Sequence, residues 1–178
     1  MNASDTLPER TGAATFHGDP LTLLGPALRA GDRAPDFVLV GNEMKPVTLR
    51  DALAGGTRSA LLIVVPSLDT PVCSVETQTF HKRLGALPAT TAAFVVSLDL
   101  PFAQQRWAAA NDAPNLTYLS DYRDRRFGPA YGVLIKEIAL LARSVFLIRP
   151  DGSLGYVELV KEISDEPNYD AVFAALTG

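Results

Sequence analysis

The only cysteine of the 178-residue chain, Cys73, lies where a thiol gains reactivity. It follows an unbroken apolar run, Ala60 to Val65, which Pro66 ends. This run predicts a strand buried on both faces, and Thr70 followed by Pro71 predicts the start of a helix with Thr70 as its N-cap. Cys73 should then lie in the first helical turn, where free backbone N–H groups and the helix dipole favour a thiolate.

A lone cysteine is, however, more often a small buried hydrophobic residue than a nucleophile. The predicted strand, tight turn and helix start favour reactivity, because pockets form at that end of a sheet. The helix should bury Val72, Val75, Phe80 and Leu84, which recur roughly at helical spacing. From these features alone, a catalytic Cys73 and a structural one are about equally well supported.

The residues around Cys73 favour the interpretation that it is catalytic. Pro66, Thr70 and Cys73 form the pattern P-x-x-x-T-x-x-C, which resembles the active-site motif of the peroxiredoxins. The surrounding PSLDTPVC, and DLPFAQQRW further along, resemble the thiol peroxidase branch of that family. The similarity continues through AYGV, LLARSVFLI and DEPNYDAVFAAL, so it covers nearly the whole chain after about Thr15.

This resemblance implies a thiol-dependent peroxidase that acts in antioxidant defence and reduces hydrogen peroxide and organic hydroperoxides through a sulfenic acid at Cys73. It also implies that Thr70 hydrogen-bonds the thiolate or the peroxide, that Pro66 shields the sulfur, and that Arg143 stabilises the charge on both. Simpler roles stand beside these. Thr70 is then only a helix cap, and Pro66 only ends a strand. Arg143 interrupts an apolar segment, so it either pairs with a carboxylate or extends to solvent.

The sequence departs from the family at one position. Thiol peroxidases generally carry a second, resolving cysteine in the helix after DLPFAQ, and Ala108 stands there in this chain. Two origins fit this alanine, a natural one-cysteine variant and a deliberate replacement. Sulfenic acid formation needs only Cys73 and its surroundings, so thioredoxin or another external thiol is the expected reductant. A non-enzymatic peroxide sensor that relays oxidation of Cys73 to a partner protein is the main alternative, and a binding domain with an inert Cys73 is another.

Neither histidine completes a Cys-His pair. His81 follows Cys73 by eight residues in the predicted helix, which places it roughly 12 Å away. His17 falls in a predicted hairpin and is expected at the surface. One cysteine and two separated histidines do not form a metal-ligand set, so we expect neither a metal nor a cofactor.

The composition is that of an ordinary globular domain, with 47% hydrophobic and 20% charged residues. The net charge of −4 and the lack of a long basic run argue against nucleic acid and membrane surfaces as partners. The longest apolar run is too short to span a bilayer. The first residues are polar and lack the apolar segment of a signal peptide, so we expect a cytoplasmic protein.

Strand and helix patterns alternate along the chain, which predicts an α/β fold with a central mixed sheet flanked by helices. The resemblance implies that this is a thioredoxin-like sandwich. We expect a flexible tail over residues 1–13 and a single domain over 14–178, which opens with a β-hairpin around Asp19–Pro20. Further strands are expected near residues 36–40, 46–49, 60–65, 91–98, 116–121, 144–148 and 154–160, and helices near 51–54, 71–84, 101–111, 125–131 and 167–176.

The segment 133–141 is unusually apolar for a predicted loop. It places Ile135, Ile138, Leu140 and Leu141 in a connection where we expect exposed side chains. Members of the resembled family pair through surfaces near the active site, so we expect a homodimer that covers this loop.

Overall fold

The structure, a computed structural model, describes residues 7–85, 90–113 and 116–177. Its strands are β1 (Glu9–Phe16), β2 (Asp19–Leu24), β3 (Val38–Val40), β4 (Pro46–Thr48), β5 (Ser59–Val64), β6 (Thr91–Ser97), β7 (Thr117–Ser120), β8 (Leu134–Ile135), β9 (Ser144–Ile148) and β10 (Leu154–Leu159). Its helices are η1 (Asn42–Met44), α1 (Leu49–Ala52), α2 (Pro71–Leu84), α3 (Pro101–Ala110), α4 (Phe127–Ala130) and α5 (Tyr169–Thr177). None of the helices within these residues is long and apolar enough to cross a membrane.

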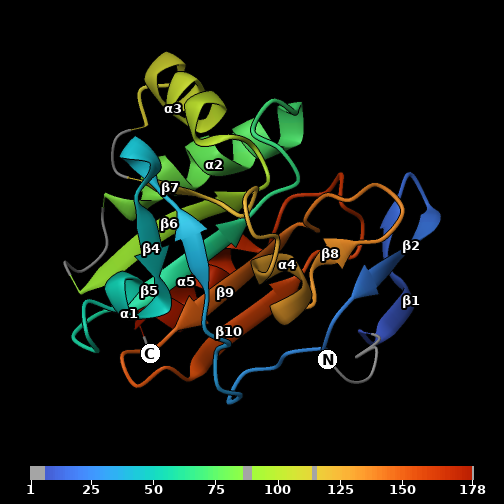
Figure 1. Cartoon of the computed structure of the whole chain (residues 1–178), viewed down its shortest axis with the longest axis horizontal. Coiled ribbons are helices and arrows are strands. Elements are labelled where there is room, and N and C mark those ends of the chain that lie inside the picture. The colour runs from blue at the N-terminus through green and yellow to red at the C-terminus, as the bar shows by residue number, and fades with distance from the viewer. Residues whose placement is uncertain (1–6, 86–89, 114–115, 178) are drawn as a thin grey trace.

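Within the described residues, the strands form a seven-stranded sheet in the order β10-β9-β5-β6-β7-β3-β4 and a three-stranded sheet in the order β1-β2-β8 (Figure 1). β5, β6 and β7 run parallel, whereas the other pairs in the large sheet are antiparallel. The predicted central mixed sheet with flanking helices and an N-terminal hairpin is thereby confirmed.

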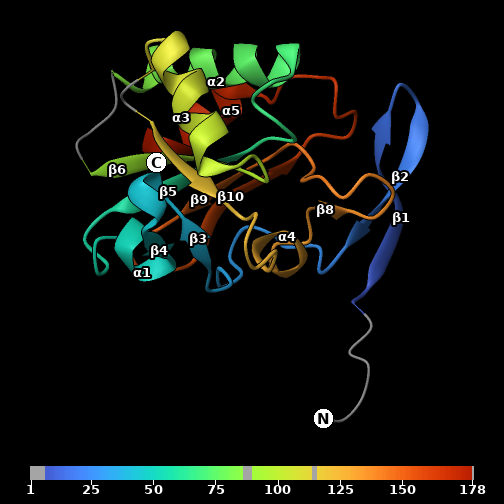
Figure 2. The same cartoon turned by 45° about the horizontal axis from the view of Figure 1, so that its top comes forward.

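β5 lies in the middle of the large sheet, and both of its faces are buried. Leu61 and Ile63 pack into a cluster with α2, α3 and α5, whereas Leu62 and Val64 pack into a second cluster with α1, α4 and the hairpin. Figure 2 shows these two sets of helices on opposite sides of the sheet. The continuous apolar run of β5 is therefore explained by burial on both sides.

The hairpin differs from the prediction in its start and in its turn. The predicted tail covered residues 1–13, but β1 begins at Glu9, so the last part of that tail belongs to a strand. Residues 1–6 lie outside the described residues. The turn is formed by His17 and Gly18, with φ of 51° and 87°, and not by Asp19–Pro20. Asp19 and Pro20 instead begin β2, whose ladder pairs them with the end of β1.

The apolar segment that follows α4 is mostly buried. Ile135 and Leu141 are 0% exposed. β8 pairs with β2 and extends the small sheet, and Leu141 forms a bridge to Leu134 of β8. Leu140 is half-buried, and Ile138 remains exposed. The expectation that this whole segment presents apolar surface is therefore wrong. Of the four residues named for it, only Ile138 is exposed.

The buried face of α2 also differs from the predicted one. Val75 is 50% exposed, and Val72 and Leu84 are only half-buried. Apolar spacing fails here because polar groups with internal partners occupy part of the buried face. The fully buried positions of this helix are Cys73, Glu76, Thr77 and Phe80.

Candidate active site

Cys73 is held at the end of the central strand by the first turn of α2. Thr70 is the N-cap residue of this helix and Pro71 occupies its first turn, as predicted. The thiol is 1% exposed and lines a cavity of about 390 Å³ together with Pro66, Thr70 and Arg143. The structure thus brings all four predicted site residues to one cavity.

Arg143 reaches the sulfur because of strand register. It directly precedes β9, and Ser144 pairs with Val64 at the end of β5, where the chain turns toward Cys73. Its Nη2 donates a hydrogen bond to Cys73 Sγ at 3.3 Å. Nε and Nη2 also donate to the carbonyl of Ile163, at 3.1 and 3.0 Å. The Arg143 side chain is 2% exposed, so these contacts replace the lost hydration of its guanidinium.

Glu76, one turn after Cys73, pairs with the same guanidinium. Its Oε2 accepts a hydrogen bond from Arg143 Nη1, and its side chain is completely buried. Its other oxygen, Oε1, has no hydrogen-bond partner among the described residues. Burial raises the pKa of Glu76 to about 8, although the charge and hydrogen bond of Arg143 oppose this rise.

Cys73 and Glu76 share one fixed positive charge, that of the Arg143 guanidinium. Burial by itself would lower the pKa of Arg143, but the Glu76 carboxylate and the Cys73 sulfur raise it above its usual value. Arg143 therefore stays charged, and near neutral pH a proton on Glu76 leaves that charge available to the sulfur. Sequence reasoning missed Glu76, although a carboxylate three residues after the cysteine lies on the same helix face.

Thr70 and Pro66 form the near wall of the cavity. One prediction was that the hydroxyl of Thr70 caps α2, and the structure shows no such bond. The hydroxyl instead donates to the carbonyl of Ser67 at 2.8 Å. This bond closes a turn within the loop before the helix. Pro66 is buried, and it adds no N–H group to a wall that faces the sulfur.

A second carboxylate fixes this loop. Asp99 accepts hydrogen bonds from Ser67 Oγ at 2.7 Å, from the backbone N–H of Leu68 at 2.8 Å and from Ser97 Oγ at 2.9 Å. Gln104 in α3 in turn donates to Ser97 Oγ at 3.0 Å. The motif DLPFAQ therefore supplies side chains that hold the loop carrying Thr70.

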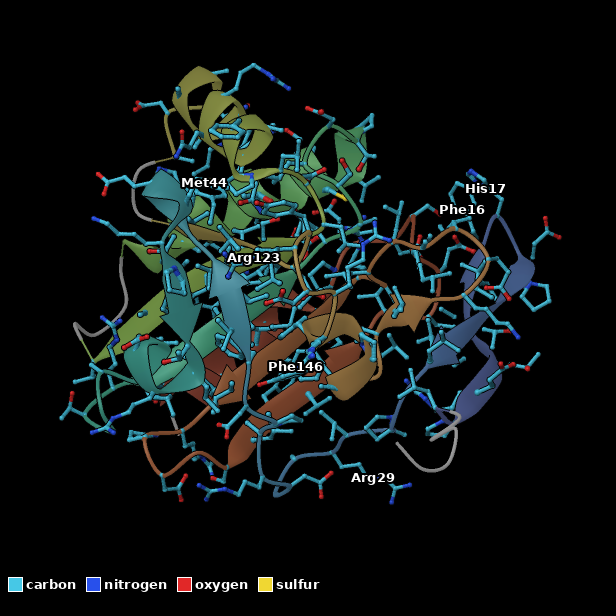
Figure 3. All side chains as sticks on the ribbon, viewed as in Figure 1. Phe16, His17, Arg29, Met44, Arg123 and Phe146 are labelled. Atoms are coloured by element: carbon cyan, nitrogen blue, oxygen red, sulfur yellow. The ribbon has the colours of Figure 1, made fainter. Side chains whose placement is uncertain are left out.

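The remaining wall of the cavity is predominantly apolar and comes from three separate segments. Figure 3 places Phe16 and His17 at the tip of the β1–β2 hairpin, beside the loops that follow β8 and β10. His17 is exposed as expected, yet it also lines the cavity, whereas His81 does not. The other apolar side chains of the lining are Pro71, Val72, Ile138, Leu140 and Ile163.

This arrangement suits a thiolate nucleophile. The guanidinium places donors beside the sulfur and beside any oxygen bound to it, and the shielded, largely apolar cavity strengthens such contacts. Ala108, where the resemblance places the missing second thiol, lies in α3 and packs against the apolar cluster that contains Cys73.

Comparisons with known proteins give consistent results. The Redoxin family model matches residues 29–173. A thiol peroxidase from Listeria innocua is 47% identical over 161 residues, which are 90% of this chain and 95% of that protein. A thiol peroxidase from Bacillus subtilis is 42% identical over 88% of this chain and 91% of its own. The crystal structure of a peroxiredoxin-like protein from Aquifex aeolicus superposes with a TM-score of 0.86 at 42% identity, and the match covers 94% of this chain and 96% of the other.

Proposed function

The chain belongs to the thiol peroxidase branch of the peroxiredoxins, and we propose that Cys73 is its peroxidatic residue. The protein is a thiol-dependent peroxidase with the thioredoxin-like fold of that family. The observation that carries the proposal is the 3.3 Å hydrogen bond from Arg143 Nη2 to Cys73 Sγ inside a shielded cavity. No other cysteine is available to attack a peroxide.

In the proposed reaction, the Cys73 thiolate attacks one oxygen of the peroxide. A sulfur–oxygen bond forms as the O–O bond breaks, so the sulfur is oxidised to sulfenic acid. The other oxygen leaves as an alkoxide or hydroxide, takes up a proton and departs as alcohol or water. Arg143 stabilises first the thiolate and then the charge that develops on the peroxide.

The other two predicted residues act on the surroundings of the sulfur. We assign to Thr70 the role of placing its hydroxyl oxygen at the cavity wall, where a peroxide hydrogen meets an acceptor. Its bond to Ser67 fixes the orientation of that oxygen. Pro66 keeps bulk water from the sulfur on this side.

Reduction of the sulfenic acid requires thiols from outside the chain, because Ala108 provides none. A first thiol condenses with the sulfenic acid to form a mixed disulfide and water, and a second thiol displaces the Cys73 thiolate. Thioredoxin or another external thiol fits this role. We also propose a cytoplasmic site of action, because a cysteine that cycles in this way needs a reducing thiol pool.

Mass spectrometry tests the first step directly. One equivalent of hydrogen peroxide in the presence of a sulfenic-acid trap should modify Cys73 and leave the rest of the chain unmodified. Cys73→Ser should abolish both the adduct and peroxidase turnover with excess thiol. Turnover that survives this substitution would refute the proposal.

The missing second thiol is tested by Ala108→Cys. If Ala108 occupies the resolving position, this variant should lose both thiols on addition of peroxide and regain them with thioredoxin. The two positions lie in different helices, so α2 and α3 must open at their ends before a disulfide can form. A thiol at position 108 that stays free after oxidation would show that Ala108 is not the resolving position.

The proposed homodimer is supported by exposed apolar side chains beside the cavity. Phe16 is 43% and Ile138 is 44% exposed, and both lie at the cavity mouth. Sedimentation at micromolar concentration should show a dimer, and Ile138→Asp should shift it toward monomer. A monomeric unmodified protein would exclude this assembly.

A further inference from the structure

The tip of the β1–β2 hairpin is held beside the cavity by one carboxylate. Glu162 follows β10, and its side chain accepts hydrogen bonds from the backbone N–H groups of His17 and Gly18, both at 3.1 Å. It also accepts one from the hydroxyl of Thr15 at 2.9 Å. The positive φ angles of the two turn residues turn successive N–H groups toward the same acceptor.

The same carboxylate also binds the other side of the cavity wall. It accepts hydrogen bonds from Ser164 Oγ at 2.7 Å and from the Ser164 backbone N–H at 3.3 Å. Backbone hydrogen bonds join the β1–β2 hairpin to the segment after β10 only up to Thr15, which bonds Lys161 and Ile163. Beyond Thr15, Glu162 provides the contacts that hold the turn in place.

The two segments that Glu162 joins both contribute side chains to the cavity lining. Phe16 and His17 come from the hairpin tip (Figure 3), and Ile163 and Ser164 come from the segment after β10. Hydrogen bonds, first the one from the Ser164 hydroxyl, lower the pKa of Glu162 to about 2, although burial opposes this. The carboxylate is thus ionised at neutral pH and remains an acceptor for all of these donors.

We infer that Glu162 determines substrate specificity by holding the hairpin tip so that Phe16 forms an apolar wall for the organic group of a bulky hydroperoxide. This inference rests on the proposed peroxidase function of Cys73. Hydrogen peroxide has no organic group and needs only the sulfur and its immediate donors. Glu162 is a positioning residue, because it contacts the wall and not the reacting atoms.

The test compares two peroxides on the full chain. Glu162→Gln replaces an acceptor-only group by an amide that cannot accept from all the present donors. The ratio of the second-order rate constants for cumene hydroperoxide and hydrogen peroxide should fall about tenfold, which is the effect of losing roughly 50 Å² of apolar contact. The fall should come from a higher KM for cumene hydroperoxide.

Asp151→Asn is the matched control. Asp151 accepts hydrogen bonds from the backbone N–H and hydroxyl of Ser153, two residues further on, as Glu162 does from Ser164. It lies in the β9–β10 turn, at the opposite end of the sheet from the cavity. This variant should leave the ratio of the two rate constants unchanged.

A double-mutant cycle with Phe16→Ala shows whether Glu162 acts through the wall. Phe16→Ala should lower the same ratio, and the double variant should lower it little further. A ratio that is unchanged in Glu162→Gln, including through equal losses for both peroxides, would overturn the inference. Fully additive effects of Glu162→Gln and Phe16→Ala would overturn it as well. Failure to form a sulfenic acid at Cys73 in the unmodified protein would instead refute the peroxidase function itself.

Discussion

Two polar networks lie near the loop from Pro66 to Thr70, and they differ in how completely their groups are paired. In the first, Asp99 accepts three hydrogen bonds from neutral donors, and Gln104 uses its amide to bond both Ser97 Oγ and the carbonyl of Leu119. In the second, Arg143 bonds Cys73 and Glu76, and Glu76 Oε1 has no partner among the described residues.

The difference separates a supporting network from a reactive one. A network with every group paired gains stability and has a single arrangement, whereas the second network contributes Cys73 and Arg143 to the cavity lining. The network of Asp99 fixes the loop, and that of Arg143 is the one that we propose receives the peroxide. Substitutions in the two networks should therefore affect different measured quantities.

The largest effect is expected for Arg143→Lys. Lysine keeps the positive charge but lacks the planar set of donors that reaches the sulfur, Glu76 and the Ile163 carbonyl together. The second-order rate constant for hydrogen peroxide should fall about a hundredfold while the far-UV circular dichroism is retained. An unchanged rate constant would return Arg143 to a structural role and remove the distinction between the networks.

A smaller effect, in stability, is expected for Asp99→Asn. The amide replaces one acceptor oxygen by a donor, so at least one of the present donors loses its partner. The free energy of unfolding should fall by about 1–3 kcal/mol in urea titrations, whereas the peroxide rate constant of the folded protein should change much less. Asp51→Asn at the exposed N-terminus of α1 is a suitable control. If activity falls as steeply as it does in Arg143→Lys, then Asp99 belongs with the reactive network.

The smallest change in rate is expected for Glu76→Gln, which removes a pH dependence. The pKa of Glu76 is raised from 4.5 to about 8, so the folded protein holds a proton that the unfolded chain releases. Stability should therefore fall, relative to the variant, as the pH rises from about 5 to 8. Above pH 8 the ionised Glu76 competes with the thiolate for Arg143.

Rate measurements check the second half of this prediction. Between pH 7 and pH 9, the rate constant with hydrogen peroxide should decline about threefold in the unmodified protein relative to Glu76→Gln. Parallel pH profiles in the two proteins would show that Glu76 does not share the charge of Arg143.

Much of this arrangement was predictable from the sequence, because the strongest local signals lie where the chemistry is. The apolar run of β5 and the Thr70–Pro71 helix start place Cys73 correctly, and the resemblance to the peroxiredoxins adds Arg143. The motif spacing cannot show where a hydroxyl points. The Thr70 side chain bonds the Ser67 carbonyl, which only the folded loop brings into range.

The misses have a common physical cause. Glu76 interrupts the apolar periodicity of α2, so a pattern that assigns polar residues to solvent places it outside. It is buried because Arg143, 67 residues further along the chain, supplies its partner. Likewise, β8 has two residues and no pattern of its own, and it forms because β2 offers it an edge. Long-range pairing decides such positions, and local sequence does not encode it.

The lack of a second cysteine changes the reaction order of the return to the reduced state. A resolving thiol in the same chain would act at an effective concentration near the millimolar range, independent of dilution. Without it, the lifetime of the sulfenic acid is set by encounters and grows in inverse proportion to the concentration of free thiol. The oxidised fraction of the protein then reports a balance of two fluxes, peroxide arriving and thiol supplied.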